Sequence, residues 1–525
     1  MFPKKTKERK HIKVTYSTLS SPDPLLHEYF EEAVEDVKAN LGKTYPMFIN
    51  GEERLAEETF TKRSPVDLDL KLGHFQLGSV QDVNDAVAAA EAAFPGWRDT
   101  PWQERVDILR RAADLISERL FYMGAAMSLE VGKNRLEALG DVEETADLIR
   151  YNCDAMEKNE GFSRRLLSES ERHHNRSVLK PYGVWVVISP FNFPGALAGG
   201  PSGAALVAGN CVILKPATDT PLSGWLLTEC FRDAGVPAGV FNFITGSGRT
   251  VGQTLVDHPD VDGITFTGSY EVGTGILREF AQGKYPRPVI AEMGGKNPTI
   301  ISRKADLDKA AMGVMRSAFG LQGQKCSACS RVYVHKEMKE PFMQKMLELT
   351  SQIKVGDPTE KDNWMGPVIN KSAYDDYQRF VADLRKSGKV VYGGETIEAN
   401  GYYVAPTIVD ELPEDHPLWK QEMFLPIVTV AGFEDLDEAM ARANDVEYGL
   451  TAGFFSEDED EIQWFLDNIE AGVLYVNRES GATTGAWPGY QSFGGWKGSG
   501  STGKAAGSFY YVQQYMKEQS HTIVD

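Results

Sequence analysis

The sequence predicts an α/β protein with two doubly wound domains, and three observations lead to this prediction. First, a chain of 525 residues is longer than the roughly 250–300 residues at which a single core stops growing. Second, short strands such as residues 184–189 are apolar throughout instead of alternating, which is typical of a parallel sheet covered on both faces. Third, helical segments separate these strands, as in an α/β fold.

The first α/β unit is preceded by a charged segment and a group of helices. Residues 1–46 are only intermittently apolar, and we expect them to form an extension lying on the surface. Apolar residues then recur at helical spacing over 82–93, 101–119 and 136–158. The predicted strands of the first unit are residues 184–189, 211–215, 240–245, 263–266 and 288–292, with a helix over 221–234.

The second unit begins after Gly294 and again mixes apolar strands with amphipathic helices. Its predicted strands are residues 331–335, 403–409, 427–433 and 472–477. Its predicted helices cover residues 340–353, 372–387, 435–443 and 458–469. The tail, residues 508–524, lacks helical stop signals, and we expect it to be extended and to pair with another subunit.

Composition excludes some classes of partner. A net charge of −20 argues against binding to a phosphate backbone, so no nucleic-acid partner is expected. The least polar stretch, residues 194–214, is broken by glycines and prolines and indicates a buried helix and strand instead of a membrane span. Five cysteines in a chain of this length are not a disulfide framework. We expect a reducing, cytoplasmic location.

The run GQKCSACSR, residues 323–331, contains the candidate nucleophile Cys326. A neighbouring cation, Lys325, and the N-terminus of a following helix would both lower the pKa of its thiol. Three other interpretations remain open at this point: a buried packing thiol, a redox pair with Cys329, and half of a zinc site. The residues alone do not distinguish the nucleophile from the buried thiol.

Two further side chains at strand ends suit chemistry on a carbonyl group. Glu292 ends an apolar strand, where poor hydration would raise its pKa toward the range of a general base. Asn192 lies in PFNFP, where its amide could stabilise an oxyanion. Taken singly, a solvated carboxylate and a turn asparagine are the plainer interpretations.

Glycines and a lysine mark a candidate phosphate-binding edge of the first sheet. Lys215 closes the strand CVILK, and Gly246, Gly248 and Gly252 follow the next strand. Their spacing is one residue longer than the dinucleotide fingerprint, and a lone glycine motif is weak evidence. The segment Thr267-Gly268-Ser269 is a second candidate phosphate contact.

Taken in order, these motifs resemble the aldehyde dehydrogenase superfamily, from about Tyr45 to the C-terminus. The segments that carry the resemblance are PFNFP, ILKPA, FTGS, EMGGKN, GQKCSA, QEMFLPI, NDVEYGL and FGGWKGSG. The resemblance implies a Rossmann-like cofactor domain, a catalytic domain and a small oligomerisation segment. The implied division is an N-terminal extension (1–46), an NAD(P)-binding domain (47–170 and 183–293), a catalytic domain (294–504) and an oligomerisation segment (171–182 and 505–525).

The resemblance also implies a role for each matching position. Cys326 would be the nucleophile, Glu292 the base for the hydrolytic water, and Asn192 part of the oxyanion hole. The implied cofactor contacts, for NAD and with no metal, are Ser189, Pro190, Lys215, Thr218, Gly246, Gly252, Thr267, Gly268, Ser269, Met293, Gly294, Glu422 and Phe424. The implied substrate contacts are Phe193, Lys325, Ser327, Gly485, Ala486 and Phe493.

Two positions depart from the superfamily pattern. Thr218 stands where a glutamate often binds the ribose hydroxyls, and the missing carboxylate removes repulsion against a 2′-phosphate. The choice between NAD and NADP therefore stays open. Leu425 in EMFLP stands where the superfamily usually has a glycine. This difference is expected to alter how the nicotinamide half of the cofactor is held.

Within the superfamily, EVGKN, FGLQGQKCSACSR and the late loop VNRESGATTGAWPGYQ most resemble the Δ1-pyrroline-5-carboxylate dehydrogenases. That resemblance implies oxidation of the small-molecule aldehyde L-glutamate γ-semialdehyde to glutamate in proline catabolism, by a homo-oligomer. The alternatives are another semialdehyde dehydrogenase, such as one for α-ketoglutarate semialdehyde, and an inactive homologue with a structural or binding role. The four residues Cys326, Glu292, Asn192 and Lys215 are all present, which favours an enzyme.

Overall fold

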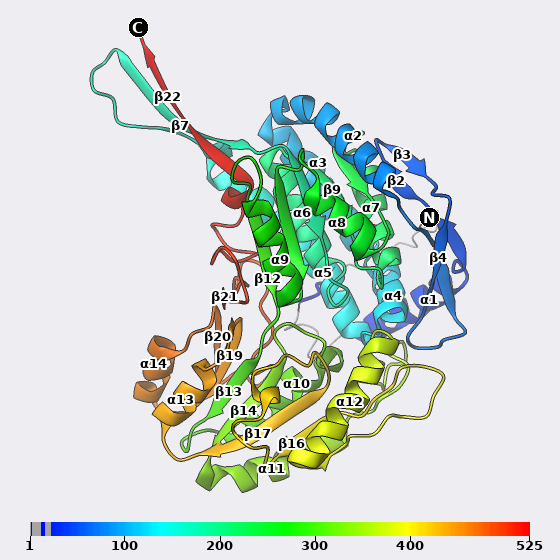
Figure 1. Cartoon of the computed structure of the whole chain (residues 1–525), viewed down its shortest axis with the longest axis vertical. Coiled ribbons are helices and arrows are strands. Elements are labelled where there is room, and N and C mark those ends of the chain that lie inside the picture. The colour runs from blue at the N-terminus through cyan, green and yellow to red at the C-terminus, as the bar shows by residue number, and fades with distance from the viewer. Residues whose placement is uncertain (1, 3–11, 16–22) are drawn as a thin grey trace.

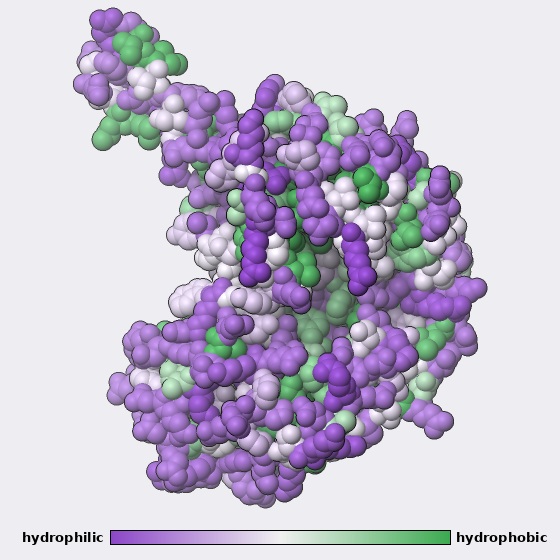
Figure 2. Space-filling model, viewed as in Figure 1, coloured by the Kyte–Doolittle hydropathy of each residue, from purple (hydrophilic) through white to green (hydrophobic). Residues whose placement is uncertain are grey.

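The computed structural model describes residues 2, 12–15 and 23–525 of the chain. Figure 1 shows two lobes, one above the other, with a long arm that extends from the upper lobe. The molecule is hollowed between the lobes, and apolar side chains gather within this hollow on the face drawn in Figure 2. An active site between two α/β lobes would therefore lie partly shielded from water.

The upper lobe is built on a seven-stranded sheet with the order β12-β11-β8-β9-β10-β2-β3. The first five strands are parallel to their neighbours, and β2 and β3 are antiparallel additions at one edge. The bounds are β12 (Val289–Met293), β11 (Gly263–Gly268), β8 (Val184–Ile188), β9 (Cys211–Lys215), β10 (Phe241–Phe243), β2 (Met47–Ile49) and β3 (Glu52–Arg54). The parallel strands follow the predicted runs, because strands buried on both faces have no polar side to alternate with.

Helices surround this sheet. Their bounds are α1 (Pro24–Lys38), α2 (Val80–Asp99), α3 (Trp102–Glu118), α4 (Leu120–Val131), α5 (Arg135–Lys158), α6 (Ala196–Ala208), α7 (Pro221–Asp233), α8 (Gln253–Asp257) and α9 (Tyr270–Ala281). Local signals set several starts: Ser79 and Asp82 form a capping box for α2, and the Asn134 side chain caps α5. Helix α5 packs against both α3 and α6, and the Asp141 side chain on α5 accepts the N–H of Ala196 at the start of α6.

The lower lobe contains a second seven-stranded sheet, with the order β15-β16-β17-β14-β13-β19-β20. Only β15 is antiparallel to its neighbour. The strands are β13 (Asn297–Ile301), β14 (Cys329–His335), β15 (Lys389–Tyr392), β16 (Thr407–Asp410), β17 (Ile427–Phe433), β19 (Thr451–Phe455) and β20 (Val473–Val476). The helices are α10 (Leu307–Phe319), α11 (Lys336–Ser351), α12 (Lys371–Ser387), α13 (Leu436–Asn444) and α14 (Glu459–Asn468).

The arm is an antiparallel sheet that joins distant parts of the sequence. Strand β7 (His173–Pro181) pairs along its whole length with β22 (Met516–Val524), and β6 (Ser163–Arg165) pairs with the other edge of β7. Two small sheets complete the fold, one of β1 (Lys43–Tyr45), β5 (Lys71–Gln76) and β4 (Thr59–Arg63), the other of β18 (Tyr448–Gly449) and β21 (Trp496–Lys497). The extended tail is thus held against its own chain.

The structure corrects the expectation that residues 1–46 only lie on the surface. In the described part of this segment, α1 packs against α4 and buries Leu26, Phe30 and Val37. These residues recur at helical spacing, which is typical of an amphipathic helix packed against a core. The predicted boundary at residue 294 falls between β12 and β13, which lie in different sheets.

Several elements were not predicted. Helices α4 and α10 and strands β13 and β19 were missed, and only the second half of the predicted strand 403–409 is regular, as β16. Helix α4 is buried all round, so it lacks the polar face that makes a helix recognisable. Among the described residues, no helix is long and apolar enough to span a membrane.

Candidate active site

A cavity of about 390 Å³ contains the candidate nucleophile in its wall. Its lining comes from both lobes: the loop after β8, the first turns of α5 and α6, the segment before β14, and the loop after β20. All six predicted substrate contacts line this cavity together with Cys326, namely Phe193, Lys325, Ser327, Gly485, Ala486 and Phe493. Positions spread over 301 residues of sequence (193 to 493) thus share one cavity.

The backbone around Cys326 is held in an unusual conformation. Leu321 and Gln322 have φ values of 49° and 56°, and Gly323 follows with φ 65°. A Cβ on Gly323 would lie 2.3 Å from the Leu425 carbonyl oxygen, so only glycine fits there. The Asn297 side-chain amide donates to the carbonyl oxygens of Cys326 (2.7 Å) and Ala328. The side chain of Asn297 and the close approach of Leu425 therefore fix the backbone of this turn.

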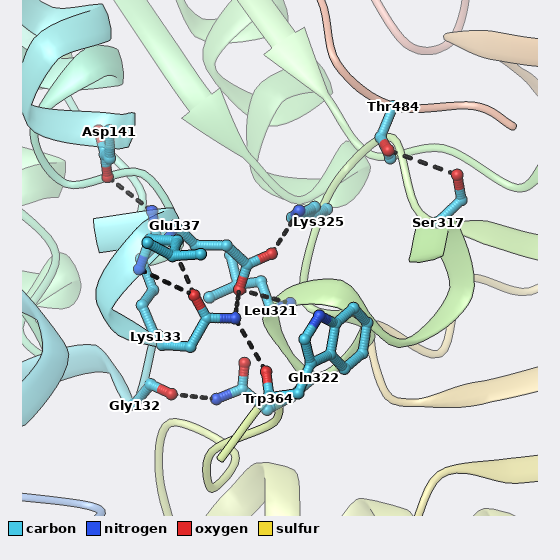
Figure 3. Close-up of polar contacts among 12 residues, drawn as sticks. Gly132, Lys133, Glu137, Asp141, Ser317, Leu321, Gln322, Lys325, Trp364 and Thr484 are labelled. Atoms are coloured by element: carbon cyan, nitrogen blue, oxygen red, sulfur yellow. Dashed lines mark hydrogen bonds and ion pairs between the residues drawn. The ribbon is translucent and has the colours of Figure 1, made fainter. Parts of the chain in front are cut away.

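The predicted activation of the thiol by Lys325 is wrong. Burial, together with the charges of Glu422 and Glu292, raises the pKa of Cys326 to about 12, while the N–H groups of Ser327 and Cys326 oppose the shift. Lys325 instead forms an ion pair with Glu137, with 2.8 Å between Nζ and Oε1 (Figure 3). No helix follows Cys326 either, since β14 begins at Cys329. The thiol therefore needs a base to become nucleophilic.

Cys329 lies in the core and its thiol is 3.2 Å from Thr299 Oγ1. Both Cys326 and Cys329 are free thiols. Within the described ranges, no group of three or more His, Cys, Asp or Glu side chains is arranged to hold a metal ion. This geometry supports a packing role for Cys329.

Glu292 lies on β12, whose outer edge is covered by the segment after β21. Met293 donates its N–H to the Ser499 carbonyl (2.8 Å), and Glu292 itself forms a bridge with Gly500. Burial raises the pKa of Glu292 to about 8, although the N–H of Gly495 opposes this shift. The rise in the pKa of Glu292 that the sequence predicts is confirmed. Its Oε2 has no hydrogen-bond partner among the described residues, which leaves this oxygen available to a water molecule.

Asn192 follows β8 and is 3 % exposed. It lies between two phenylalanines with separate contacts: Phe191 packs edge-on against Phe424, with 5.7 Å between ring centroids, while Phe193 lines the cavity. Asn192 is thus held between the cavity wall and the loop after β16 that carries Phe424. From there its amide could donate to a substrate oxygen.

The predicted cofactor contacts gather at the carboxyl ends of β8, β9, β10 and β11. Lys215 is 4 % exposed, and burial lowers the pKa of its ammonium group to about 8. The Ser189 hydroxyl is buried without a partner among the described residues, and a Cβ on Gly252 would lie 3.7 Å from Lys215 Cε. An unpartnered hydroxyl and a glycine-opened turn beside a buried cation fit a dinucleotide at this edge.

The other predicted contacts of this edge lie around it. Gly246 has φ 147° and accepts a hydrogen bond from Thr218 Oγ1 at 3.4 Å. Thr267 and Gly268 end β11, and the Ser269 side chain caps α9. Pro190 directly follows Ser189 after β8. A capped helix N-terminus is a suitable position for a phosphate group.

The nicotinamide-end residues lie close to the nucleophile. Glu422 accepts the N–H of Gly295 at 2.9 Å, and burial raises its pKa to about 7. A Cβ on Gly294 would lie 2.1 Å from the Glu422 carboxylate, so the glycine permits this approach. Phe424 has φ 56°, and Leu425 is buried.

Charged residues that the sequence analysis did not single out also line the cavity: Glu137, Glu144, Arg316 and Arg478. Glu137 accepts from Lys325 and from the N–H of Leu321 (3.1 Å), so it joins α5 to the turn before the nucleophile (Figure 3). The spacing of Asn134 and Glu137 is that of a helix cap and its third residue, a signal that could have placed Glu137 at the start of α5.

The fold and the site together define a class: an α/β protein in which a dinucleotide-type sheet lies beside a thiol and a buried carboxyl group. Comparison with known proteins gives the family. The profile of the aldehyde dehydrogenase family matches residues 52–521. The chain therefore belongs to the aldehyde dehydrogenase family.

Three known proteins show which members of the family this chain is similar to. The chain is 39 % identical over 500 residues to a 1-pyrroline-5-carboxylate dehydrogenase of Bacillus mycoides, with 94 % of the chain and 96 % of the relative covered. The 1-pyrroline-5-carboxylate dehydrogenase from Thermus with bound NAD is 32 % identical with a TM-score of 0.93, and both chains are fully covered. Proline utilization A from Bdellovibrio bacteriovorus is 35 % identical with a TM-score of 0.91; 94 % of this chain matches about half (51 %) of that larger protein.

Proposed function

We propose that the protein oxidises L-glutamate γ-semialdehyde, the open form of 1-pyrroline-5-carboxylate, to glutamate with NAD or NADP. One observation carries the proposal: the nucleophile and the six predicted substrate contacts share a cavity whose wall bears both signs of charge. A zwitterionic amino acid with a terminal aldehyde matches such a wall. The names of the Bacillus and Thermus relatives support the same reaction.

The reaction begins at Cys326. Burial keeps this thiol protonated, so its proton has to pass to a base as the sulfur attacks the aldehyde carbon. Glu422 and Glu292, the two carboxylates whose charge acts on the thiol, both have a raised pKa. The Asn192 amide and the Cys326 N–H would stabilise the oxyanion of the resulting hemithioacetal.

A bound nicotinamide cofactor would supply the hydride acceptor, and Lys215, Ser189, Ser269, Glu422 and Phe424 would hold it. Oxidation converts the hemithioacetal into a thioester on Cys326. Glu292 then takes a proton from a water molecule that attacks the thioester. Burial raises the pKa of Glu292 to about 8, so the carboxylate, in its ionised form, is a stronger base than an ordinary glutamate and can accept a proton from water.

The amino-acid end of the substrate would bind at the far wall. Its carboxylate is assigned to Lys325, the Ser327 hydroxyl and the N–H groups of Gly485 and Ala486. Gly485 has φ 114°, and a Cβ there would lie 2.3 Å from Arg478 Nη2. Any larger residue would therefore both strain the loop and displace Arg478.

We also propose a homo-oligomer in a reducing, cytoplasmic compartment. Strands β7 and β22 form an arm that extends from the upper lobe (Figure 1), and Leu167, Ile523 and Val524 at or near its outer part are 95 %, 61 % and 56 % exposed. Exposed apolar side chains of this kind favour contact with a second copy. The five free thiols suit the reducing compartment.

The test is a steady-state assay with 1-pyrroline-5-carboxylate and with simple aliphatic aldehydes, using NAD and NADP in turn. We expect a kcat/KM for the semialdehyde that exceeds the value for an aliphatic aldehyde of similar length by at least about 10²-fold, because the latter leaves charged wall residues unpaired. Cys326→Ala should abolish turnover. Full activity of Cys326→Ala, or an equal preference for aliphatic aldehydes, would refute the proposal.

A further inference from the structure

A buried ion pair lies directly behind the wall of the cavity. Lys133 and Asp141 have fully buried side chains, with 2.7 Å between Nζ and Oδ2. Lys133 is in the short connection between α4 and α5, and Asp141 is on α5 (Figure 3). Neither residue lines the cavity, and the mechanism above uses neither.

Both members of the pair contact the loop between β8 and α6. The Lys133 ammonium group lies 3.8 Å from the centroid of the Phe193 ring. The second carboxylate oxygen of Asp141 accepts the N–H of Ala196 at 2.7 Å. The pair thus contacts two groups of the loop that are three residues apart, the ring of Phe193 and the backbone N–H of Ala196. Phe193 and Ala196 are themselves part of the cavity wall.

The Lys133–Asp141 pair is one of several contacts on this loop, which also packs through Phe191 against Phe424. The loop has no regular structure between β8 and α6, and Gly195 packs so tightly that an added Cβ would lie 2.6 Å from Thr145 Oγ1 and 3.1 Å from Asp141 Oδ1. Asn192 precedes Phe193 directly. A shift of the Phe193 ring or of the Ala196 amide would therefore move the predicted oxyanion donor.

Stability alone does not explain a pair of this kind. Taking two charges out of water is costly, and their attraction often no more than offsets that cost. The pair instead defines one geometry for the loop. The Lys133 ammonium group lies against the Phe193 ring, and the Asp141 carboxylate binds this cation with one oxygen and the Ala196 N–H with the other. Such a pair suits the positioning of a reactive loop.

We propose that Lys133 and Asp141 are positioning residues that hold the loop of residues 191–196, and with it Asn192 and Phe193, in the geometry that the reaction requires. This inference rests on the proposed function, because it needs Asn192 to act on the substrate oxygen. The pair acts through the loop and touches neither substrate nor nucleophile.

The experiment compares the variants Lys133→Met and Asp141→Asn, each alone and combined with Asn192→Ala. Methionine keeps the apolar stem of Lys133, and asparagine can still accept the Ala196 N–H. We expect each single variant to lower kcat by on the order of 10²-fold, the effect of a misplacement of about 1 Å. Because the pair acts through Asn192, Lys133→Met should lower kcat by less than about 3-fold when Asn192→Ala is already present.

Readouts independent of the loop separate positioning from general damage. Alkylation of the Cys326 thiol by iodoacetamide and the Kd of the cofactor should stay within about 3-fold of the unmodified protein, since neither needs an oxyanion donor. The matched control is Arg119→Met, which removes the Arg119–Asp233 ion pair at the opposite end of α4 and should leave kcat unchanged.

Three outcomes would overturn the inference: unchanged kcat in folded Lys133→Met and Asp141→Asn, fully additive losses with Asn192→Ala, or a loss of thiol alkylation equal to the loss of kcat. If Lys133→Met does not fold, the isosteric Asp141→Asn carries the same test. If the unmodified protein does not oxidise the semialdehyde while Cys326→Ala and Asn192→Ala alter turnover of another aldehyde, the substrate assignment fails and the positioning inference stands.

Discussion

At the scale of single residues, burial controls the acidity of the groups at the site. It raises the pKa of Cys326 to about 12 and that of Glu292 to about 8. Both groups are therefore largely protonated in the resting protein at neutral pH. The chemistry depends on bases that accept protons only when the substrate and the water are in position.

This acidity makes a prediction about stability. The pKa of Glu292 is about 4.5 in an unfolded chain and about 8 in the folded protein, so between these values the folded state binds more protons than the unfolded state. The free energy of unfolding should therefore fall as pH rises through this window. Glu292→Gln removes this term and should stabilise the protein at pH 8.5 relative to the unmodified chain, but much less at pH 5.

Denaturant unfolding at the two pH values measures the effect, with the exposed Glu118→Gln as the control. An equal change in the free energy of unfolding for Glu292→Gln at pH 5 and pH 8.5 would contradict a carboxyl group with a raised pKa.

The nucleotide end gives a second prediction at this scale. Thr218 is uncharged, and its hydroxyl donates to the Gly246 carbonyl at this edge of the sheet. Thr218→Glu introduces a carboxylate, which should repel the 2′-phosphate of NADP and lower kcat/KM for NADP by about 10-fold or more, while NAD is little affected. Thr218→Gln, of equal size and without charge, is the control, and the same loss in both variants would argue against charge repulsion.

The sequence identified these residues better than it described their surroundings. Short motifs were sufficient to name Cys326, Glu292 and the six cavity residues, because a motif specifies which residue type stands at each of its positions. The environment of the thiol could not: the partner of Lys325 is Glu137, 188 positions away in the chain, and only the fold brings them together. The predicted lowering of the thiol pKa failed because the fold buries Cys326 near two carboxylates and pairs Lys325 with Glu137.

At the scale of elements, a buried carboxylate anchors α7 to α4. Glu130 accepts the N–H groups of Leu222 (2.7 Å) and Ser223 (2.9 Å), and the Ser223 hydroxyl (2.6 Å). A carboxylate at a helix N-terminus satisfies free N–H groups and interacts favourably with the helix dipole. The motif EVGKN thus begins with a helix-anchoring residue and continues with the positioning residue Lys133.

Glu130→Ala should lower the free energy of unfolding by about 2–4 kcal/mol, because it leaves three buried donors without an acceptor. Denaturant titration at pH 7 checks this value. The exposed Glu118→Ala on the neighbouring α3 is the matched control and should change stability by less than about 0.5 kcal/mol. Equal effects of the two substitutions would show that the contacts of Glu130 contribute nothing.

Elements with a strong periodic pattern could be predicted, and buried elements could not. The parallel strands of the upper sheet and the helices α3, α5 and α12 follow their predicted ranges closely, whereas α2 continues to Asp99, beyond its predicted end at residue 93. Helix α4 was not predicted because it is buried on all sides, and β13 was not predicted because the second residue of NPTII is a proline, which argues against a central strand.

At the scale of the whole molecule, the arm pairs residues 173–181 with residues 516–524 and extends from the upper lobe (Figure 1). If it mediates assembly, a charge at its exposed apolar positions should weaken that contact. We expect Leu167→Glu combined with Ile523→Glu to reduce the mass measured by light scattering. Leu55→Glu, at a leucine outside the arm that is about as exposed (66 %) as Ile523, should leave the mass unchanged. A monomeric unmodified protein would refute the proposed homo-oligomer.

The central claim is that a thioester forms on Cys326 and that Glu292 activates the water that hydrolyses it. The most direct measurement is a rapid-mixing experiment with Glu292→Gln, 1-pyrroline-5-carboxylate and the cofactor. The account predicts a burst of about one reduced cofactor per active site, followed by turnover at least about 10²-fold slower than in the unmodified protein. Steady turnover at the unmodified rate, or the complete absence of a burst in the folded variant, would contradict it.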